Sequence, residues 1–236
     1  MNQHTDTPFP PDWSLQRPKS VLQSLYDLVG APLRMALLPD HISEKLHLTS
    51  LRAERFAVVL PEMRGRVLDV GAGDNILLKA YIRRHEQCGS EEIDAVQASV
   101  GVDVVDWGGG TTMIERSDDL PFQDESFDTV LFIACLNHIP EREGALRETL
   151  RVLKPGGRVV MTMIGKRLGD IGHAIWWYSE DKHRDVDEDE VMGIDSQDML
   201  GLMRGAGFVG IQHRSFVYGL NHLFIGHKAA DSAGDR

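Results

Sequence analysis

Short apolar runs alternate with stretches of helical periodicity along the middle of this chain. The compact apolar run at residues 67–70 is typical of a parallel strand that is buried on both faces. A glycine turn follows, and the apolar positions from Ile76 onward predict a helix whose free N–H groups face that turn. Further apolar strands are predicted over residues 99–103 and 129–133. This alternation predicts an α/β fold with a parallel sheet.

Two helices are predicted before the first strand. Apolar positions recur at helical spacing from Val21 to Val29. Residues 50–60 predict a second helix, with Thr49 or Ser50 as its N-cap.

One helix and two strands are predicted near the C-terminus. Asp195 or Ser196 is expected to cap a helix that runs to about Gly205. The last two strands are predicted over residues 208–218 and 220–227.

These elements predict a division of the chain into segments. We expect a flexible N-terminal arm over residues 1–20, a helical cap over 21–60, the main domain over 61–228 with a substrate-covering insertion at 165–193, and a disordered tail over 229–236. We favour a cap that packs on the main domain. The alternative is a cap over the substrate mouth that makes peripheral contact with lipid.

Composition limits the classes of partner. The chain has 236 residues, enough for one well-cored domain, and a net charge of -11, which argues against nucleic acid as a partner. Cys88 and Cys135 have no metal-like companions, so no metal site is expected. No signal peptide or apolar span long enough for stable membrane insertion is seen, and we expect a cytoplasmic protein.

The glycine turn indicates a nucleotide-like cofactor. Gly71 and Gly73 let the backbone turn tightly and let a ligand approach closely. Ile76 stands where a dinucleotide fingerprint requires its third glycine. Asp69 and Asp74 would repel a diphosphate but not a cationic sulfonium with an amino-acid tail. The turn therefore favours a sulfonium cofactor over NAD.

The segment from Arg66 to Asn75, Arg-Val-Leu-Asp-Val-Gly-Ala-Gly-Asp-Asn, resembles the first motif of the class I S-adenosylmethionine-dependent methyltransferases. That motif reads roughly V-L-D-x-G-x-G-x-G. Asn75 stands in place of the third glycine, and Asn tolerates left-handed backbone angles better than most residues. We therefore expect the turn to keep its shape.

The next strand is expected to end in an acidic residue that binds ribose. Asp103 closes the sequence Val-Gly-Val-Asp, where its carboxylate can accept hydrogen bonds from both ribose hydroxyls. Asp103 lies 34 residues after Asp69 (103 − 69 = 34), whereas a separation of about 20 residues is typical of a minimal βαβ unit. We interpret the polar stretch at residues 85–94 as a surface insertion that accounts for the extra length.

Two further segments resemble the same family. Residues 120–128 follow its pattern L-P-F-x-D-x-S-F-D, and residues 148–160 match its helix, Pro-Gly-Gly turn and fifth strand. The family usually contacts the adenine amino group with an Asp at the position that is Arg116 here. Ser117 and Asp118 are our substitute candidates for that contact.

The resemblance implies a Rossmann-like, doubly wound sheet of seven strands in the order 3-2-1-4-5-7-6, with the last strand antiparallel. It also implies S-adenosyl-L-methionine as the cofactor. The cofactor contacts that it implies are Asp69, Gly71, Ala72, Gly73, Asn75, Asp103, Val104, Ser117, Asp118, Asp119, Ile133 and Ala134.

Three histidines are candidates for acid–base catalysis. His138 follows the fourth strand, a location that faces the transferred methyl group in many proteins of this family, and it is the first choice for a general base. The alternatives for His138 are packing against the next helix or orienting the substrate. His173 and His183 lie in the insertion, where Trp176 and Trp177 either line an apolar pocket or cover a hydrophobic edge.

The predicted function is transfer of a methyl group from S-adenosylmethionine to a small, apolar or aromatic acceptor. One alternative is a non-catalytic protein that binds S-adenosylmethionine as a regulator or partner subunit, consistent with the departures at Asn75 and Arg116. A third hypothesis, an NAD-dependent oxidoreductase, is disfavoured by Ile76. The oligomeric state is not indicated by the sequence.

Overall fold

The computed structural model describes residues 20–31, 43, 45–164 and 194–230. Its centre is a seven-stranded sheet in the order β3-β2-β1-β4-β5-β7-β6. β7 runs antiparallel to both of its neighbours, and the other paired strands are parallel. The predicted order and the antiparallel last strand are therefore confirmed. The strands are β1 Val67–Val70, β2 Val100–Asp103, β3 Thr112–Met113, β4 Phe127–Ile133, β5 Leu153–Ile164, β6 Val209–Phe216 and β7 Asn221–His227.

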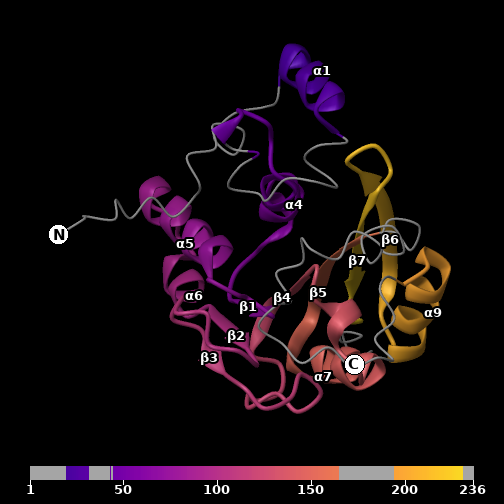
Figure 1. Cartoon of the computed structure of the whole chain (residues 1–236). Helices are drawn as coiled ribbons and strands as arrows, with labels where there is room; N and C mark the ends of the chain where they lie inside the picture. Colours follow the sequence, from indigo (N-terminus) through magenta and orange to yellow (C-terminus); the bar gives the residue numbers. More distant parts are fainter. Residues whose placement is uncertain (1–19, 32–42, 44, 165–193, 231–236) are drawn as a thin grey trace.

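Helices cover both faces of the sheet (Figure 1). α7 and α9 bury apolar side chains against one face, and α4, α5 and α6 bury theirs against the other. The helices are α1 Val21–Val29, α4 Leu51–Val59, α5 Ile76–Cys88, α6 Ile93–Gln97, α7 Arg142–Val152 and α9 Ser196–Ala206, with 3-10 turns η2 Leu60–Glu62 and η3 Leu136–His138.

The continuous apolar character of β1 follows from its position at the centre of the sheet. Leu68 and Val70 point into the core beside α7 and α9, whereas Val67 points into the core beside α4 and α5. Asp69 alternates onto the same face as Val67 and is buried there. A single acidic side chain therefore enters an otherwise apolar strand next to the glycine turn.

The helix ends follow the expected capping chemistry. Ser50 caps α4 by accepting a hydrogen bond from the backbone N–H of Ala53 at 3.1 Å. Asp195 caps α9 in the same way, and Gly207 ends that helix in a left-handed conformation. These caps determine the residues at which α4 and α9 begin.

Two details differ from the sequence analysis. The stretch at 85–94 is not one surface insertion, because α5 continues to Cys88 and α6 begins at Ile93. Pro155 and Gly156 lie within the bounds of β5, where the register against β4 jumps from Leu153 to Arg158. Gly156 has a left-handed φ of 76°, so the turn geometry that these residues favour is kept as a bulge inside the strand.

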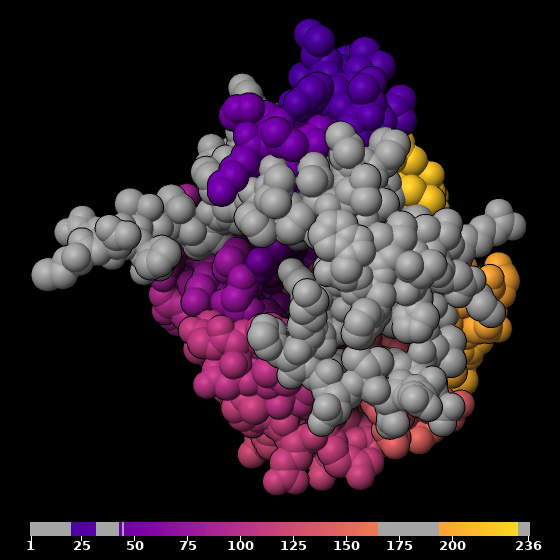
Figure 2. All heavy atoms as spheres, viewed as in Figure 1, coloured from indigo at the N-terminus to yellow at the C-terminus, as the bar shows by residue number. Residues whose placement is uncertain are grey.

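The first helix has an unusual distribution of polarity. Asp27 is fully buried, and its carboxylate accepts hydrogen bonds from the backbone N–H and the hydroxyl of Thr49 at 3.0 and 2.7 Å. Leu22 and Val29 are each 81% exposed. Figure 2 shows α1 projecting from the rest of the described surface. Polar contacts therefore hold α1 in place, and much of its apolar surface faces outward.

The predicted segment boundaries remain predictions. The arm, the insertion at 165–193 and most of the tail lie outside the described residues. Among the residues that the structure describes, no helix has the length and apolar character needed to cross a membrane.

Candidate functional site

The glycine turn after β1 is held by the neighbouring strand and by the end of β4. The backbone N–H groups of Gly71 and Ala72 donate to the carbonyl of Val102 at 2.9 and 3.1 Å. A Cβ on Gly71 would lie 2.8 Å from the Cβ of Cys135, so packing requires a glycine there. A Cβ on Gly73 would meet nothing within 4 Å. Gly73 therefore borders open space, as a ligand-binding glycine should.

Asn75 keeps the turn in shape despite replacing a glycine. Its φ of 59° is left-handed, as its tolerance for such angles predicts. A Cβ on Gly101 of β2 would lie 2.5 Å from Asn75 Oδ1, so the glycine in β2 makes room for the asparagine side chain. Asn75 Oδ1 is buried and has no hydrogen-bond partner among the described residues.

Asp103 stands beside the turn at the end of β2. Its Oδ2 accepts the backbone N–H of Gly73 at 2.9 Å, and its Oδ1 accepts that of Val105 at 3.1 Å. Each carboxylate oxygen has a second lone pair, so both can accept a further hydrogen bond from a ligand hydroxyl. Val104, the next residue, is 45% exposed and offers an apolar surface at the same edge.

Asp69 is the most perturbed acid near the turn. Burial, and to a smaller extent the nearby charges of Asp103 and Asp74, raises its pKa to about 8. Asp69 Oδ1 has no hydrogen-bond partner among the described residues. A buried, unpaired acceptor beside two other carboxylates is suited to a cationic ligand group.

The end of β4 supplies the candidate base. Ala134 adopts a left-handed φ of 57°, and its N–H donates to the carbonyl of Thr162 at 2.9 Å. η3 follows, and there Asn137 Nδ2 lies 3.1 Å from His138 Nε2. Arg142 of α7 donates to the carbonyl of Asn137 at 2.7 Å. These contacts hold η3, which carries His138 and directly follows Cys135. The side chain of Cys135 packs against Gly71 of the glycine turn.

The predicted adenine contact has a partner within the chain. Arg116 forms a two-bond ion pair with Asp118, with distances of 2.8 and 2.5 Å, and this pair lowers the pKa of the Asp118 carboxyl. A Cβ on Gly144 would lie 2.8 Å from the Cβ of Asp118, so α7 begins directly against that side chain. The guanidinium of Arg116 cannot accept a hydrogen bond from the adenine amino group, whereas the carboxylate of Asp118 can. Asp118 and Ser117 remain the predicted candidates.

The structure brings most of the predicted residues to the carboxyl edge of the parallel strands. Asp69, Gly71, Gly73, Asn75 and Asp103 lie around one turn, as shown by the contacts above. Ile133 and Ala134 end the adjacent strand β4. This edge is where ligands of open α/β sheets bind. His173 and His183 lie outside the described residues.

Sequence reasoning missed three residues of this region. Arg52 of α4 forms an ion pair with Asp74 in the glycine turn. The thiol of Cys135 donates to the carbonyl of Val70 at 3.0 Å, and burial raises the pKa of that thiol. Arg142 holds η3. Arg52 has no local sequence signal, because its partner is 22 residues away; Cys135 could have been found from its place just after a buried strand.

The residues present fit S-adenosylmethionine. The buried, unpaired oxygen of Asp69 suits the ammonium group of its amino-acid tail, and the open space at Gly73 allows close approach of the ligand. Asp103 can accept hydrogen bonds from ribose hydroxyls. No group of three or more metal-ligating side chains occurs in the part of the chain that the structure describes.

The sheet order, the glycine turn and the acidic strand ends define a class I S-adenosylmethionine-dependent methyltransferase. A model of one family in this class, described as "Methyltransferase domain", matches residues 68–161. The match begins in β1 and ends in β5, so it covers the glycine turn, Asp103 and the candidate base.

Two relatives are similar to this chain in sequence, and a solved structure is similar to it in fold. A ubiquinone/menaquinone biosynthesis C-methyltransferase of Azotobacter vinelandii is 29% identical over 216 residues, covering 81% of this chain and 84% of that relative. The enzyme of the same name from Vibrio vulnificus is 29% identical over 185 residues, covering 69% and 71%. A crystal structure of an S-adenosylmethionine-dependent methyltransferase from Thermotoga maritima has a TM-score of 0.56 at 17% identity and covers 92% of this chain and 99% of that one. The structural likeness concerns the fold alone.

Proposed function

We propose that this enzyme transfers a methyl group to a ring carbon of a small quinol-type aromatic acceptor. The relatives from A. vinelandii and V. vulnificus, both C-methyltransferases of quinone biosynthesis, support a carbon acceptor. The observation that carries the proposed base is the position of η3, which contains His138 and directly follows Cys135, the residue that packs against Gly71. Location in the cytoplasm remains a prediction.

Carbon methylation needs an electron-rich ring and a methyl group that can be displaced. S-adenosylmethionine, when bound, supplies the methyl group on a positively charged sulfur. A quinol hydroxyl that gives up its proton raises the electron density at the adjacent ring carbon. That carbon forms the new C–C bond as the methyl–sulfur bond breaks, with the electron pair staying on sulfur. The same carbon then loses its proton to solvent water, and the electrons of that C–H bond restore the aromatic ring.

The chain's own residues contribute a base and alignment. The amide of Asn137 donates to His138 Nε2, so that ring nitrogen carries a lone pair and the imidazole is oriented. In the proposed mechanism the quinol hydroxyl takes the place of the Asn137 amide at His138 Nε2 and gives its proton to that nitrogen. Holding acceptor and methyl group in line lowers the entropic part of the barrier further.

Labelled methyl transfer tests the proposed acceptor directly. The full chain is incubated with methyl-labelled S-adenosylmethionine and 2-prenyl-1,4-naphthoquinol, kept reduced by dithionite. We expect label on the ring carbon, detected by mass spectrometry and NMR, and none with the oxidised quinone. Label on an oxygen, or binding of the cofactor without any transfer, would overturn the proposal; the second result would favour the regulatory alternative.

A histidine variant tests the base. His138→Gln is expected to lower kcat by about 100-fold, because a general base typically contributes that much. Affinity for S-adenosylhomocysteine, measured by calorimetry, is expected to stay unchanged. His213→Gln, on the exposed strand β6, is the matched control and should retain full activity. If His138→Gln weakens binding and turnover equally, His138 has a binding role.

A further inference from the structure

The glycine turn combines a negative environment with one ion-paired guanidinium. Asp69, Asp74 and Asp103 lie close enough that the charges of the latter two help to raise the pKa of Asp69 to about 8, after the larger effect of burial. Arg52 is ion-paired with Asp74 within this group. The amino-acid tail of the cofactor carries both an ammonium and a carboxylate. The acids suit the ammonium, but they repel the carboxylate unless a cation lies beside it.

The position of Arg52 is fixed from both ends. Its backbone lies in the first turn of α4, which Ser50 caps and whose Ala53 is buried. Its guanidinium lies over the ring of Phe56, with the central carbon 5.3 Å from the ring centroid. α4 thereby presents a pre-positioned cation to the turn, and little side-chain freedom remains to be lost on binding a ligand.

The partner of Arg52 is fixed as well. Asp74 Oδ1 accepts the backbone N–H of Ile76 at 3.3 Å, at the start of α5. A Cβ on Gly109 would lie 2.4 Å from the backbone of Asp74, so the loop after β2 packs against it from another side. The ion pair therefore stands at a defined place in the turn.

Arg52 remains open to a second anion. Its side chain is 33% exposed and that of Asp74 is 37% exposed, so both can be reached from the solvent. The contact with Asp74 uses Nη2, whereas a guanidinium carries five N–H donors in a planar fork that matches a carboxylate. The open space at Gly73 lies in the same turn.

We propose that Arg52 binds the carboxylate of the amino-acid tail of S-adenosylmethionine. The N-terminal cap then forms part of the cofactor site through α4, in addition to any role near the acceptor. This inference rests on the cofactor and not on the quinol-type acceptor proposed above, so each can fail without the other.

A thermodynamic cycle with two ligands isolates this contact. Calorimetry is carried out on the full chain with S-adenosylhomocysteine and with S-adenosyl-3-thiopropylamine, which keeps the ammonium and lacks the carboxylate. Arg52→Gln is expected to weaken S-adenosylhomocysteine binding by about 10- to 100-fold, the range for a charge-assisted hydrogen bond. Its effect on the decarboxylated ligand is expected to be about threefold or less. Binding of S-adenosylhomocysteine to the wild type shows that the site accepts this class of cofactor, whatever the effect of Arg52→Gln.

Two further variants complete the test. Arg55 lies on the same helix and donates to Asn221 at 3.4 Å, and Arg55→Gln should leave the preference for the carboxylate intact. Arg52→Lys keeps the charge and should lose only part of the preference, and it serves if Arg52→Gln does not fold. Equal losses for both ligands, or no loss for either, would overturn the proposal.

Discussion

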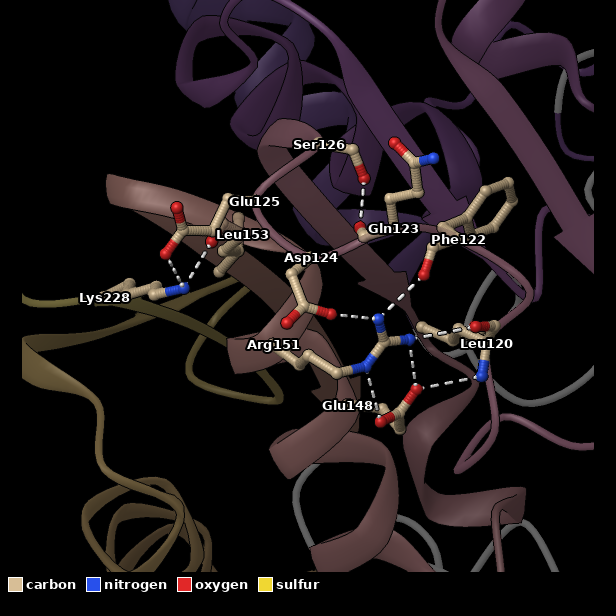
Figure 3. Close-up of polar contacts among 10 residues, drawn as sticks. All are labelled: Leu120, Phe122, Gln123, Asp124, Glu125, Ser126, Glu148, Arg151, Leu153 and Lys228. Carbon is tan, nitrogen blue, oxygen red and sulfur yellow. Dashed lines mark hydrogen bonds and ion pairs between the residues drawn. The ribbon is translucent and has the colours of Figure 1, made fainter.

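Two motif segments of this chain, both typical of the family, differ sharply in how their polar groups are satisfied. In the glycine turn, Asp69 Oδ1 and Asn75 Oδ1 are buried without hydrogen-bond partners among the described residues. In the segment at 120–128, side chains of the protein itself hold the loop. Arg151 donates to Glu148 and Asp124 and to the carbonyls of Leu120 and Phe122, as Figure 3 shows.

The difference separates a ligand site from a structural one. Buried polar atoms are normally paired, because an unpaired one costs free energy. Glu148 also accepts the backbone N–H of Leu120 at 3.0 Å, so the loop is tied from two directions without any ligand. At the glycine turn, Asp69 and Asn75 each have a buried acceptor that no described residue satisfies. A family motif can therefore serve either the fold or the chemistry.

The largest effect is expected from breaking the loop network. Arg151→Met leaves two carbonyls and Glu148 without their donor, and we expect the free energy of unfolding to fall by about 2–3 kcal/mol. Urea titration measures this loss. Affinity of the folded protein for S-adenosylhomocysteine should not change.

Arg147→Met is the matched control on the same helix. Arg147 pairs with Glu143 at 3.6 Å, and both side chains are well exposed, so its loss should cost less than about 0.5 kcal/mol. If both variants lose a similar amount of free energy of unfolding, the Arg151 network contributes no more to stability than an ordinary surface ion pair does.

Asp69→Asn is expected to lower the affinity for the cofactor and to raise the stability of the free protein, the reverse of what is expected for Arg151→Met. Affinity for S-adenosylhomocysteine should fall by about tenfold, because the ammonium loses a charged partner. The free protein should become more stable at pH 8. The pKa of Asp69 is about 8 in the folded protein against 3.8 for an unperturbed Asp, so the folded state holds an extra proton between these values and loses stability as pH rises through them.

Thermal unfolding at two pH values checks the sign of that effect. The gain in Tm of Asp69→Asn over the wild type should be larger at pH 8 than at pH 5. A gain that is equal at both values, or a loss, would contradict the assignment of the raised pKa to this side chain.

The smallest effect is expected in the pH dependence of cofactor binding. A cationic ligand favours the ionised form of Asp69, so binding below pH 8 releases a proton. Wild-type affinity for S-adenosylhomocysteine should rise several-fold between pH 6 and 8, as about tenfold per unit is the limit for one proton. Calorimetry in buffers of different ionisation enthalpy measures the released proton. A similar rise in Asp69→Asn would assign the proton to another group.

The sequence predicted the elements whose signal is local. The apolar runs of β1 and β4 and the caps at Ser50 and Asp195 were found because pattern and capping chemistry lie within a few residues. The strand order came from the family resemblance. β3, only two exposed residues long, has no periodicity to detect and exists through its pairing with β2.

The parts of the site that escaped prediction depend on distant contacts. The unusual pKa of Asp69 results from burial and from acids on other segments. The pair of Arg52 and Asp74 joins two elements that only the folded chain brings together. The left-handed conformation of Asn75 was predictable from residue type, but the space for its side chain at Gly101 was not.

The contact of Asn75 with Gly101 also constrains how this chain can change over evolutionary time. A side chain at position 101 would lie 2.5 Å from Asn75 Oδ1, so the two positions are epistatic. A mutation of Asn75 to Gly, the usual residue of the family, removes that obstacle, and only then does alanine at 101 become tolerable, against the remaining contact of 3.0 Å with Ala72. The order of the two substitutions decides whether the intermediate sequence retains a working cofactor site.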